Sequence, residues 1–130
     1  MTALEVGAEA EPVVAHADLA SSVRYAGASG DLNPLHFDAG TASEVSPTGG
    51  IIAHGMYSMG LASRMLTTFA GGPEHVLDLQ IRFTRPWPLG TTSTFTGKVT
   101  AVEDGIATVA VVGTNEETGR ILRGTAKVRV

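Results

Sequence analysis

The sequence predicts an α+β fold in which a curved antiparallel β-sheet wraps around one long central helix. Two observations lead to this fold class. Residues 50–69 form a long segment that is apolar on most sides, and after residue 76 the hydrophobic pattern changes from a helical period to the alternation typical of strands. Short helices followed by hairpin-connected strands are typical of the α+β class. With 130 residues, we expect a single domain that spans residues 1–130.

The first part of the chain predicts several short elements. Residues 2–14 are consistent with a short strand or arm. A short helix is expected to follow, with Asp18 or His16 as its N-cap and its end near Gly27. Residues 38–46 predict a second short helix, and the proline and glycines that come after it indicate a loop.

The segment 50–69 predicts the long helix. Its one formal charge is Arg64, and the Gly-Gly-Pro run at 71–73 ends it. Its apolar side chains are spread too widely for one stripe, so we expect a helix buried on most sides. It also carries small residues that would let a surrounding sheet approach closely: Gly55, Ser58, Gly60, Ala62 and Ser63.

Four strands are predicted after the helix. The first alternates apolar and polar residues, with Leu77, Leu79, Ile81 and Phe83 on one face. Asp104-Gly105 is a type I′ hairpin signal between two of the later strands. These later strands are expected at residues 91–102, 106–114 and 120–130, and their inward-facing residues include Phe95, Gly97, Val99, Leu122, Gly124, Ala126 and Val128.

Composition excludes several classes of function. The chain has no cysteine, which rules out disulfides, thiolate zinc sites and cysteine nucleophiles. A net charge of −4 argues against nucleic acid as the main partner. No stretch is apolar enough to span a membrane, and the acidic N-terminus is unlike a signal or transit peptide, so we expect a cytoplasmic protein.

The candidate site lies in the stretch YAGASGDLNPLHFD, which contains Asp31 and His36. Neither a helix nor a strand brings side chains five positions apart together. Asn33-Pro34 opposes a continuous helix and predicts a turn, in which a carboxylate and an imidazole can converge as general acid–base chemistry requires. The alternative is structural, with Asp31 capping a helix or an Asx-turn and His36 half-buried.

The segment GDLNPLHFD resembles the hydratase signature of the MaoC-like, (R)-specific enoyl-thioester hydratases (hydratase 2 type). It matches that signature at Gly30, Asp31, Asn33, Pro34, Leu35, His36 and Asp38. Two further segments, IIAHGMYSMGLASRML and RFTRPWPLGTT, resemble the family's helix and its strand end with a Pro-Gly turn. The resemblance covers most of the chain and is weakest before Asp18. It implies a hot-dog fold, which agrees with the pattern of helices and strands.

The resemblance implies hydration of an enoyl thioester, or the reverse dehydration of a 3-hydroxyacyl thioester, with Asp31 and His36 as the catalytic dyad. Asn33 would hold the loop or the water, or it is a turn residue before proline. The Gly55 N–H would stabilise the thioester oxyanion at a helix N-terminus, although close packing also explains this glycine. For His54 a structural role is expected, with a direct role in the site as the alternative. The remaining candidates for an acyl tunnel, which are core residues in the alternative reading, are Tyr25, Met56 and Trp87.

The implied substrate is an acyl-CoA or acyl-carrier-protein thioester, with no cofactor and no metal. Three basic residues, Arg82, Arg85 and Lys98, are expected near the pocket mouth, facing the carrier's phosphates. The sheet edge predicts a dimer whose two sheets run together, formed by two copies or with another hot-dog subunit. The second half of the chain also resembles small subunits of steroid side-chain and mycolic-acid hydratases, which leaves a scaffold or acyl-binding role as an alternative. A hot-dog thioesterase is a third possibility.

Overall fold

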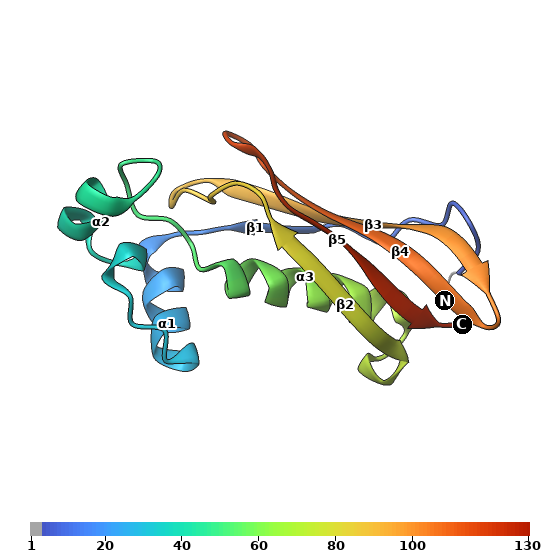
Figure 1. Cartoon of the computed structure of the whole chain (residues 1–130). Coiled ribbons are helices and arrows are strands. Elements are labelled where there is room, and N and C mark those ends of the chain that lie inside the picture. The colour runs from blue at the N-terminus through green and yellow to red at the C-terminus, as the bar shows by residue number, and fades with distance from the viewer. Residues whose placement is uncertain (1–3) are drawn as a thin grey trace.

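The structure is a computed structural model that describes residues 4–130. A five-stranded antiparallel sheet lies across one long helix, and two shorter helices extend beyond one end of the sheet (Figure 1). The helices are α1 (Leu19–Ser29), α2 (Ala39–Val45) and α3 (Gly55–Ala70), with 3₁₀ helices η1 (Pro34–His36) and η2 (Pro73–His75). The strands are β1 (Val13–His16), β2 (Val76–Phe83), β3 (Thr92–Glu103), β4 (Ile106–Asn115) and β5 (Gly119–Arg129).

The strand order is β1-β3-β4-β5-β2, so β1 and β2 form the two edges. One face of α3 packs on the sheet through a core that includes Met65, Leu66, Phe95 and Leu122. A Cβ on Gly97 of β3 would lie 3.0 Å from the Met65 sulfur, so this glycine allows the close approach of helix and sheet. The predicted α+β class and the hot-dog arrangement of helix and sheet are confirmed.

The predictions for β3 and for the turn that follows it are confirmed. Phe95, Gly97 and Val99 face the core, as expected. Asp104 and Gly105 have φ values of 52° and 74°, as a type I′ turn between β3 and β4 requires. Residues 2–3 of the expected N-terminal arm lie outside the described residues. The rest of the arm runs beside β3, where Glu9 forms an isolated bridge with Lys98 before β1 begins.

Two residues of the predicted apolar face of β2, Leu77 and Phe83, are more exposed than alternation predicts. Leu77 is expected to face the core, but its side chain is 43% exposed. The cause is a register shift between Val76 and Asp78, which inserts an extra residue into β2. Val76 therefore packs against the core in place of Leu77, whereas Leu79 and Ile81 pack there as alternation predicts.

The helix boundaries also differ from the predictions. α1 continues through Gly27 and ends at Ser29, followed by the C-cap Gly30, whose φ of 78° is left-handed and whose N–H donates to the Ala26 carbonyl. α3 begins at Gly55 rather than residue 50, because Ile52 pairs with Pro88 and Ala53 donates to the Trp87 carbonyl. The segment before α3 is thus extended by a contact that is distant in sequence.

The expectation that α3 is buried on most sides is wrong for a single chain. Its buried residues, Ser58, Ala62, Met65, Leu66 and Ala70, form one face. On the other side, Met56 is 58% exposed, and a Cβ on Gly60 would have no neighbour within 4 Å. The sheet covers the helix from one side only (Figure 1). None of the described helices is long and apolar enough to cross a membrane.

Candidate active site

The turn between α1 and α2 is built by successive side-chain caps. The Asp31 carboxylate accepts a hydrogen bond from the Asn33 N–H at 3.2 Å, and the Asn33 side chain accepts one from the Leu35 N–H at 3.1 Å. Pro34 opens η1, where its missing N–H costs nothing. The Ser22 hydroxyl of α1 donates to the His36 carbonyl, which ties the end of the turn to the preceding helix.

This turn brings Asp31 and His36 together, as the sequence argument predicts. His36 Nε2 lies 4.0 Å from Asp31 Oδ2, which is too long for a direct hydrogen bond. His36 Nδ1 lies 2.7 Å from the Ile52 carbonyl oxygen. A carbonyl only accepts, so Nδ1 carries the hydrogen and a neutral His36 presents the lone pair of Nε2 toward Asp31. The Asp31 side chain is 52% exposed and the His36 side chain 11%, so the pair lies at the protein surface.

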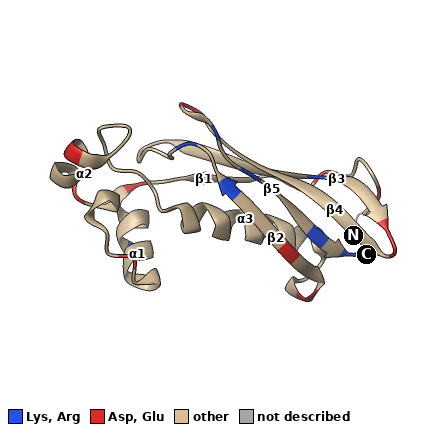
Figure 2. Cartoon of the chain, in the orientation of Figure 1, with Lys and Arg blue, Asp and Glu red and all other residues tan. Residues whose placement is uncertain are grey.

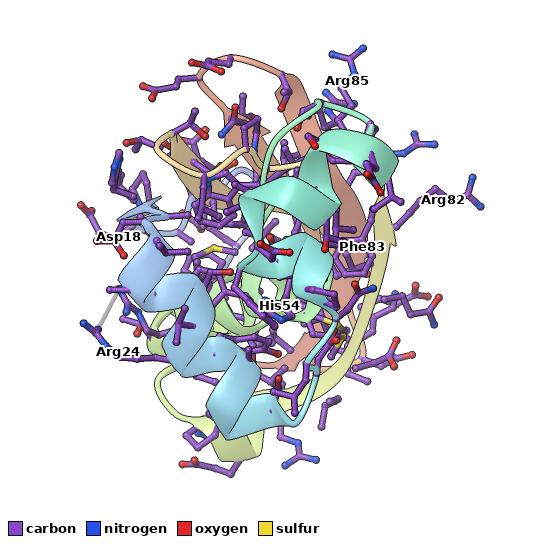
Figure 3. The ribbon with its side chains drawn as sticks, turned by 90° about the vertical axis from the view of Figure 1, so that its left-hand side faces the viewer. Asp18, Arg24, His54, Arg82, Phe83 and Arg85 are labelled. Carbon is purple, nitrogen blue, oxygen red and sulfur yellow. The ribbon has the colours of Figure 1, made fainter. Side chains whose placement is uncertain are left out.

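A third group, His54, lies beside this pair. Its ring is stacked on that of His36 with centroids 3.8 Å apart, and it is only 2% exposed. Its Nε2 lies 3.1 Å from the Asp31 carbonyl oxygen and 4.0 Å from Asp31 Oδ2. Figure 3, viewed from the end that carries α1 and α2, shows His54 behind these helices near the middle of the molecule.

Asp31, His36 and His54 are the one group of metal-ligand type among the described residues. Each offers an atom within 4.8 Å of the other two. His54 Nε2, however, already donates to the Asp31 carbonyl, and the two rings are stacked rather than splayed around a common point. Coordination by all three through His54 Nε2 would require that hydrogen bond to break. The absence of a metal therefore stays a prediction.

Next to the pair is a pocket of about 370 Å³ that opens to solvent. His36 lies on its wall, and most of the lining is apolar. Gly55, at the start of α3, is also part of the wall. The other lining residues are Pro47, Ile52, Ala53, Ser58, Phe83, Thr84, Arg85, Pro86, Trp87 and Ile121.

Gly55 lies at the start of α3 and packs closely against Phe83, and its oxyanion role stays a prediction. It is the first residue of α3, so its N–H has no acceptor within the helix and lies at the positive end of the helix dipole. A Cβ at this position would lie 3.3 Å from the Phe83 ring, so the glycine also permits close packing. Gly55 is therefore a helix-start residue in the wall of the apolar pocket.

The other predicted residues are divided between the pocket and its surroundings. Trp87 lines the pocket but is 2% exposed, and its indole N–H donates to the Thr91 carbonyl. Tyr25 packs on His54, with centroids 4.8 Å apart, and lines a separate hollow beside α1. Met56 projects into solvent and is not part of the lining. Substrate contact by these residues stays a prediction.

The three basic residues expected at the pocket mouth do not lie together. Arg85 lines the pocket and donates to the Thr118 carbonyl at 2.8 Å. Arg82 follows the inward-facing Ile81 and lines a groove on the outer face of the sheet. Lys98 is exposed on β3 between the buried Gly97 and Val99, so it also faces outward. Figure 3 shows Arg82 and Arg85 extending away from the body of the protein, and Figure 2 shows that Lys and Arg recur along the sheet.

Comparison with known proteins identifies the family. Residues 5–121 match the model of the MaoC-like domain. The chain belongs to the MaoC-like family. It is 34% identical over 110 residues to the 3-oxo-4,17-pregnadiene-20-carboxyl-CoA hydratase beta subunit of Mycobacterium tuberculosis, covering 85% of this chain and 84% of that protein.

Solved structures support the same assignment. The MaoC-like chain superposes on a chain of the ChsH1-ChsH2 complex from Mycobacterium tuberculosis with a TM-score of 0.86 and 31% identity, covering 97% of this chain and 98% of the other. It superposes on the (R)-hydratase from A. caviae involved in PHA biosynthesis with a TM-score of 0.89 and 27% identity, covering 100% and 99% of the two chains. The family therefore includes hydratases of the same length and fold.

Sequence reasoning missed one contact of the site. The expected structural role of His54 stays a prediction, but its contact with Asp31 was not foreseen because it joins residues 23 positions apart. The A-H-G segment at the start of the long helix was the available signal, but it does not reveal a tertiary contact. Ile121 was also missed as a pocket residue, because it is the extra residue at a register shift between β4 and β5.

Proposed function

We propose that this MaoC-like protein is an (R)-specific enoyl-thioester hydratase, or in reverse a 3-hydroxyacyl-thioester dehydratase, and that Asp31 and His36 carry out the acid–base chemistry. The observation that carries the proposal is the facing pair of proton acceptors, His36 Nε2 and Asp31 Oδ2, beside an apolar pocket. The hydratase names of the relatives support it.

The separation of 4.0 Å suits a water that donates one hydrogen to each acceptor. Such a water has both hydrogens engaged and directs a lone pair toward the substrate. As its oxygen bonds to C3, one O–H bond breaks and the proton passes to the Asp31/His36 pair. The π electrons of the C2=C3 bond shift toward the thioester oxygen, and a proton from the pair then completes the new C2–H bond. The sum is the addition of one water across the double bond.

The developing charge on the thioester oxygen requires a fixed donor. The Gly55 N–H is suited to this role because it has no helical acceptor and lies at the positive end of α3. Apolar residues of the pocket, such as Ile52, Phe83 and Ile121, would hold the acyl chain. Arg85 at the pocket would meet the phosphates of CoA or of a carrier protein's pantetheine arm.

The test compares wild-type protein with Asp31→Asn and His36→Gln, using crotonyl-CoA and a longer enoyl-CoA. Each variant should lose roughly two or more orders of magnitude in hydration rate. Thermal unfolding checks that each variant keeps its fold, which matters most for the His36 variant because that side chain is 11% exposed. Loss of the conjugated enoyl absorbance without thiol release identifies hydration. Release of free thiol identifies a thioesterase instead, and full activity in Asp31→Asn removes Asp31 from the mechanism.

We also propose that the protein functions as a dimer joined through β2. β2 pairs with β5 on one side, and its outer edge has no strand partner among the described residues; Leu77 and Phe83 on this strand are 43% and 48% exposed. The pocket is open beside Phe83, so a second subunit would help to enclose it. The beta-subunit name of one relative and the two-chain complex of another support a dimer with a different hot-dog subunit as well as one of two copies. Light scattering at micromolar concentration tests this, and an active monomer would refute it.

A further inference from the structure

His54 holds an uncommon position for a histidine. It precedes the first residue of α3 as the N-cap, yet its side chain makes no capping hydrogen bond. The ring is 2% exposed and is turned toward the Asp31–His36 turn, between the rings of His36 at 3.8 Å and Tyr25 at 4.8 Å. Because the His54 side chain does not cap α3, the presence of histidine at this position must be explained by the other contacts of its ring.

The one polar contact of the His54 ring fixes its tautomer. The Asp31 carbonyl accepts from Nε2 at 3.1 Å, so Nε2 carries the hydrogen and Nδ1 has a lone pair. Nδ1 is buried and has no hydrogen-bond partner among the described residues. Burying an unpaired polar atom is unfavourable, and an apolar side chain would fill the same space without that cost. Core packing alone therefore does not account for histidine here.

The hydrogen bond to Asp31 acts on a residue that is otherwise weakly held. Asp31 lies at the exposed rim of the turn, and its other bonds are local, from its own N–H to Ser29 and from Asn33 to its carboxylate. His54 is the described residue that joins the Asp31 backbone to the main body of the fold. It thereby limits the movement of the carboxylate relative to α3.

The same short segment also positions His36. The Ile52 carbonyl, two residues before His54, accepts from His36 Nδ1 at 2.7 Å, and the His54 ring forms the surface on which the His36 ring is stacked. Residues 52–54 thus hold both members of the facing pair, one through a carbonyl and the other through an imidazole N–H. Gly55, the next residue, supplies the proposed oxyanion donor.

We infer that His54 is a positioning residue that sets the spacing of Asp31 and His36 through its Nε2–H bond to the Asp31 carbonyl and its stacking on His36. This inference rests on the proposed function, because the spacing matters when a water must be held between the two groups. A misplacement of about 1 Å at a reacting centre can reduce the rate about 10²-fold.

Three substitutions separate the two contacts of His54. In His54→Gln the amide nitrogen can reach the place of Nε2 and keep the donor, whereas in His54→Asn the shorter amide reaches only the place of Nδ1. His54→Phe keeps the ring and loses the donor. We expect kcat to fall about 10- to 100-fold in the Asn and Phe variants, with KM within about twofold of wild type, and the Gln variant to recover a substantial part of kcat.

Equal kcat for wild type and a folded His54→Phe protein overturns the inference, as does equal loss in the Gln and Asn variants. If His54→Phe does not fold, the Gln and Asn pair decides, because both lose the ring and differ only in reach. Thermal unfolding of each variant separates loss of stability from loss of rate.

A second readout does not depend on turnover. Long-range ¹H–¹⁵N spectra of the imidazoles should show the wild-type His54 hydrogen on Nε2 and the His36 hydrogen on Nδ1. The Leu32 amide signal, which reports on the Asp31 carbonyl because both belong to one peptide group, should move in His54→Asn and His54→Phe and stay close to wild type in His54→Gln. A His54 hydrogen on Nδ1 would overturn the inference even for an active enzyme. Failure of the wild type to hydrate any enoyl-CoA, with these spectra as expected, would instead reject the proposed function.

Discussion

Replacing Gly55 with alanine separates the two roles of this glycine. The added Cβ would lie 3.3 Å from two atoms of the Phe83 ring and 3.4 Å from a third. These contacts are tighter than usual, but the Phe83 side chain is 48% exposed and can move by a few tenths of an ångström. Overpacking in a closed core costs about 1–3 kcal/mol, so the cost at this open site should be below about 1 kcal/mol.

The matched control is Gly60→Ala, one and a half turns further along α3. Its Cβ would meet no atom within 4 Å, and alanine is favoured over glycine in a helix by up to about 1 kcal/mol. Gly60→Ala should therefore be slightly more stable than wild type in thermal unfolding. Gly55→Ala should remain within about 4 °C of wild type, since about 1 kcal/mol corresponds to a few degrees in a domain of this size.

Hydration rates should separate the two variants much further than their stabilities. If the thioester oxygen must approach the Gly55 N–H, a methyl group in the pocket wall obstructs it, and loss of an oxyanion donor costs about 10²-fold or more in kcat. Gly60→Ala should keep wild-type kcat. A Gly55→Ala protein with full activity would refute the oxyanion role, and one that is destabilised by several kcal/mol would show that packing against Phe83 is what requires the glycine.

Three further predictions concern charge and assembly. Arg85→Glu should raise KM for a CoA substrate far more than it lowers kcat, because a contact with a remote phosphate stabilises the bound substrate and the transition state equally. The control Arg82→Glu, on the outer face of the sheet, should leave KM near wild type in the same steady-state assay. Leu77→Lys at the exposed β2 edge should shift the light-scattering mass from two chains toward one, and an unchanged mass would exclude this edge from the interface. Hydrogen bonds from the Ser21 N–H and hydroxyl lower the pKa of Asp18 in the folded protein. This N-cap therefore stabilises the fold at pH values above the unfolded-state pKa of Asp18, and its contribution is lost as the pH falls through the folded-state pKa. An NMR titration that gives an ordinary or raised pKa for Asp18 would contradict this prediction.

Local chemistry accounts for what the sequence predicted correctly. The Asn33-Pro34 turn was sufficient to predict that Asp31 and His36 converge, because proline limits the backbone and Asx side chains cap it. Likewise, Asp104-Gly105 specified its own hairpin through two positive φ values. These features depend on neighbouring residues, which a sequence displays directly.

The features that were missed depend on contacts between distant segments. Nothing near residue 50 shows that Ile52 pairs with Pro88, so the start of α3 was placed five residues too early. The bulge that exposes Leu77 arises from its pairing with β5, and the role of His54 arises from the approach of α3 to the turn. The open face of α3 was missed for a different reason, because an apolar helix pattern does not distinguish burial within a chain from burial against a partner.

The most direct test of the central claim is product analysis after incubation of the purified protein with crotonyl-CoA. Addition of water by Asp31 and His36 predicts (R)-3-hydroxybutyryl-CoA, with the thioester intact and no free CoA. The (S) product would contradict the proposed specificity, and free CoA would replace hydration with hydrolysis. An unchanged substrate would contradict catalysis by this chain alone and would favour its role as one subunit of a larger hydratase.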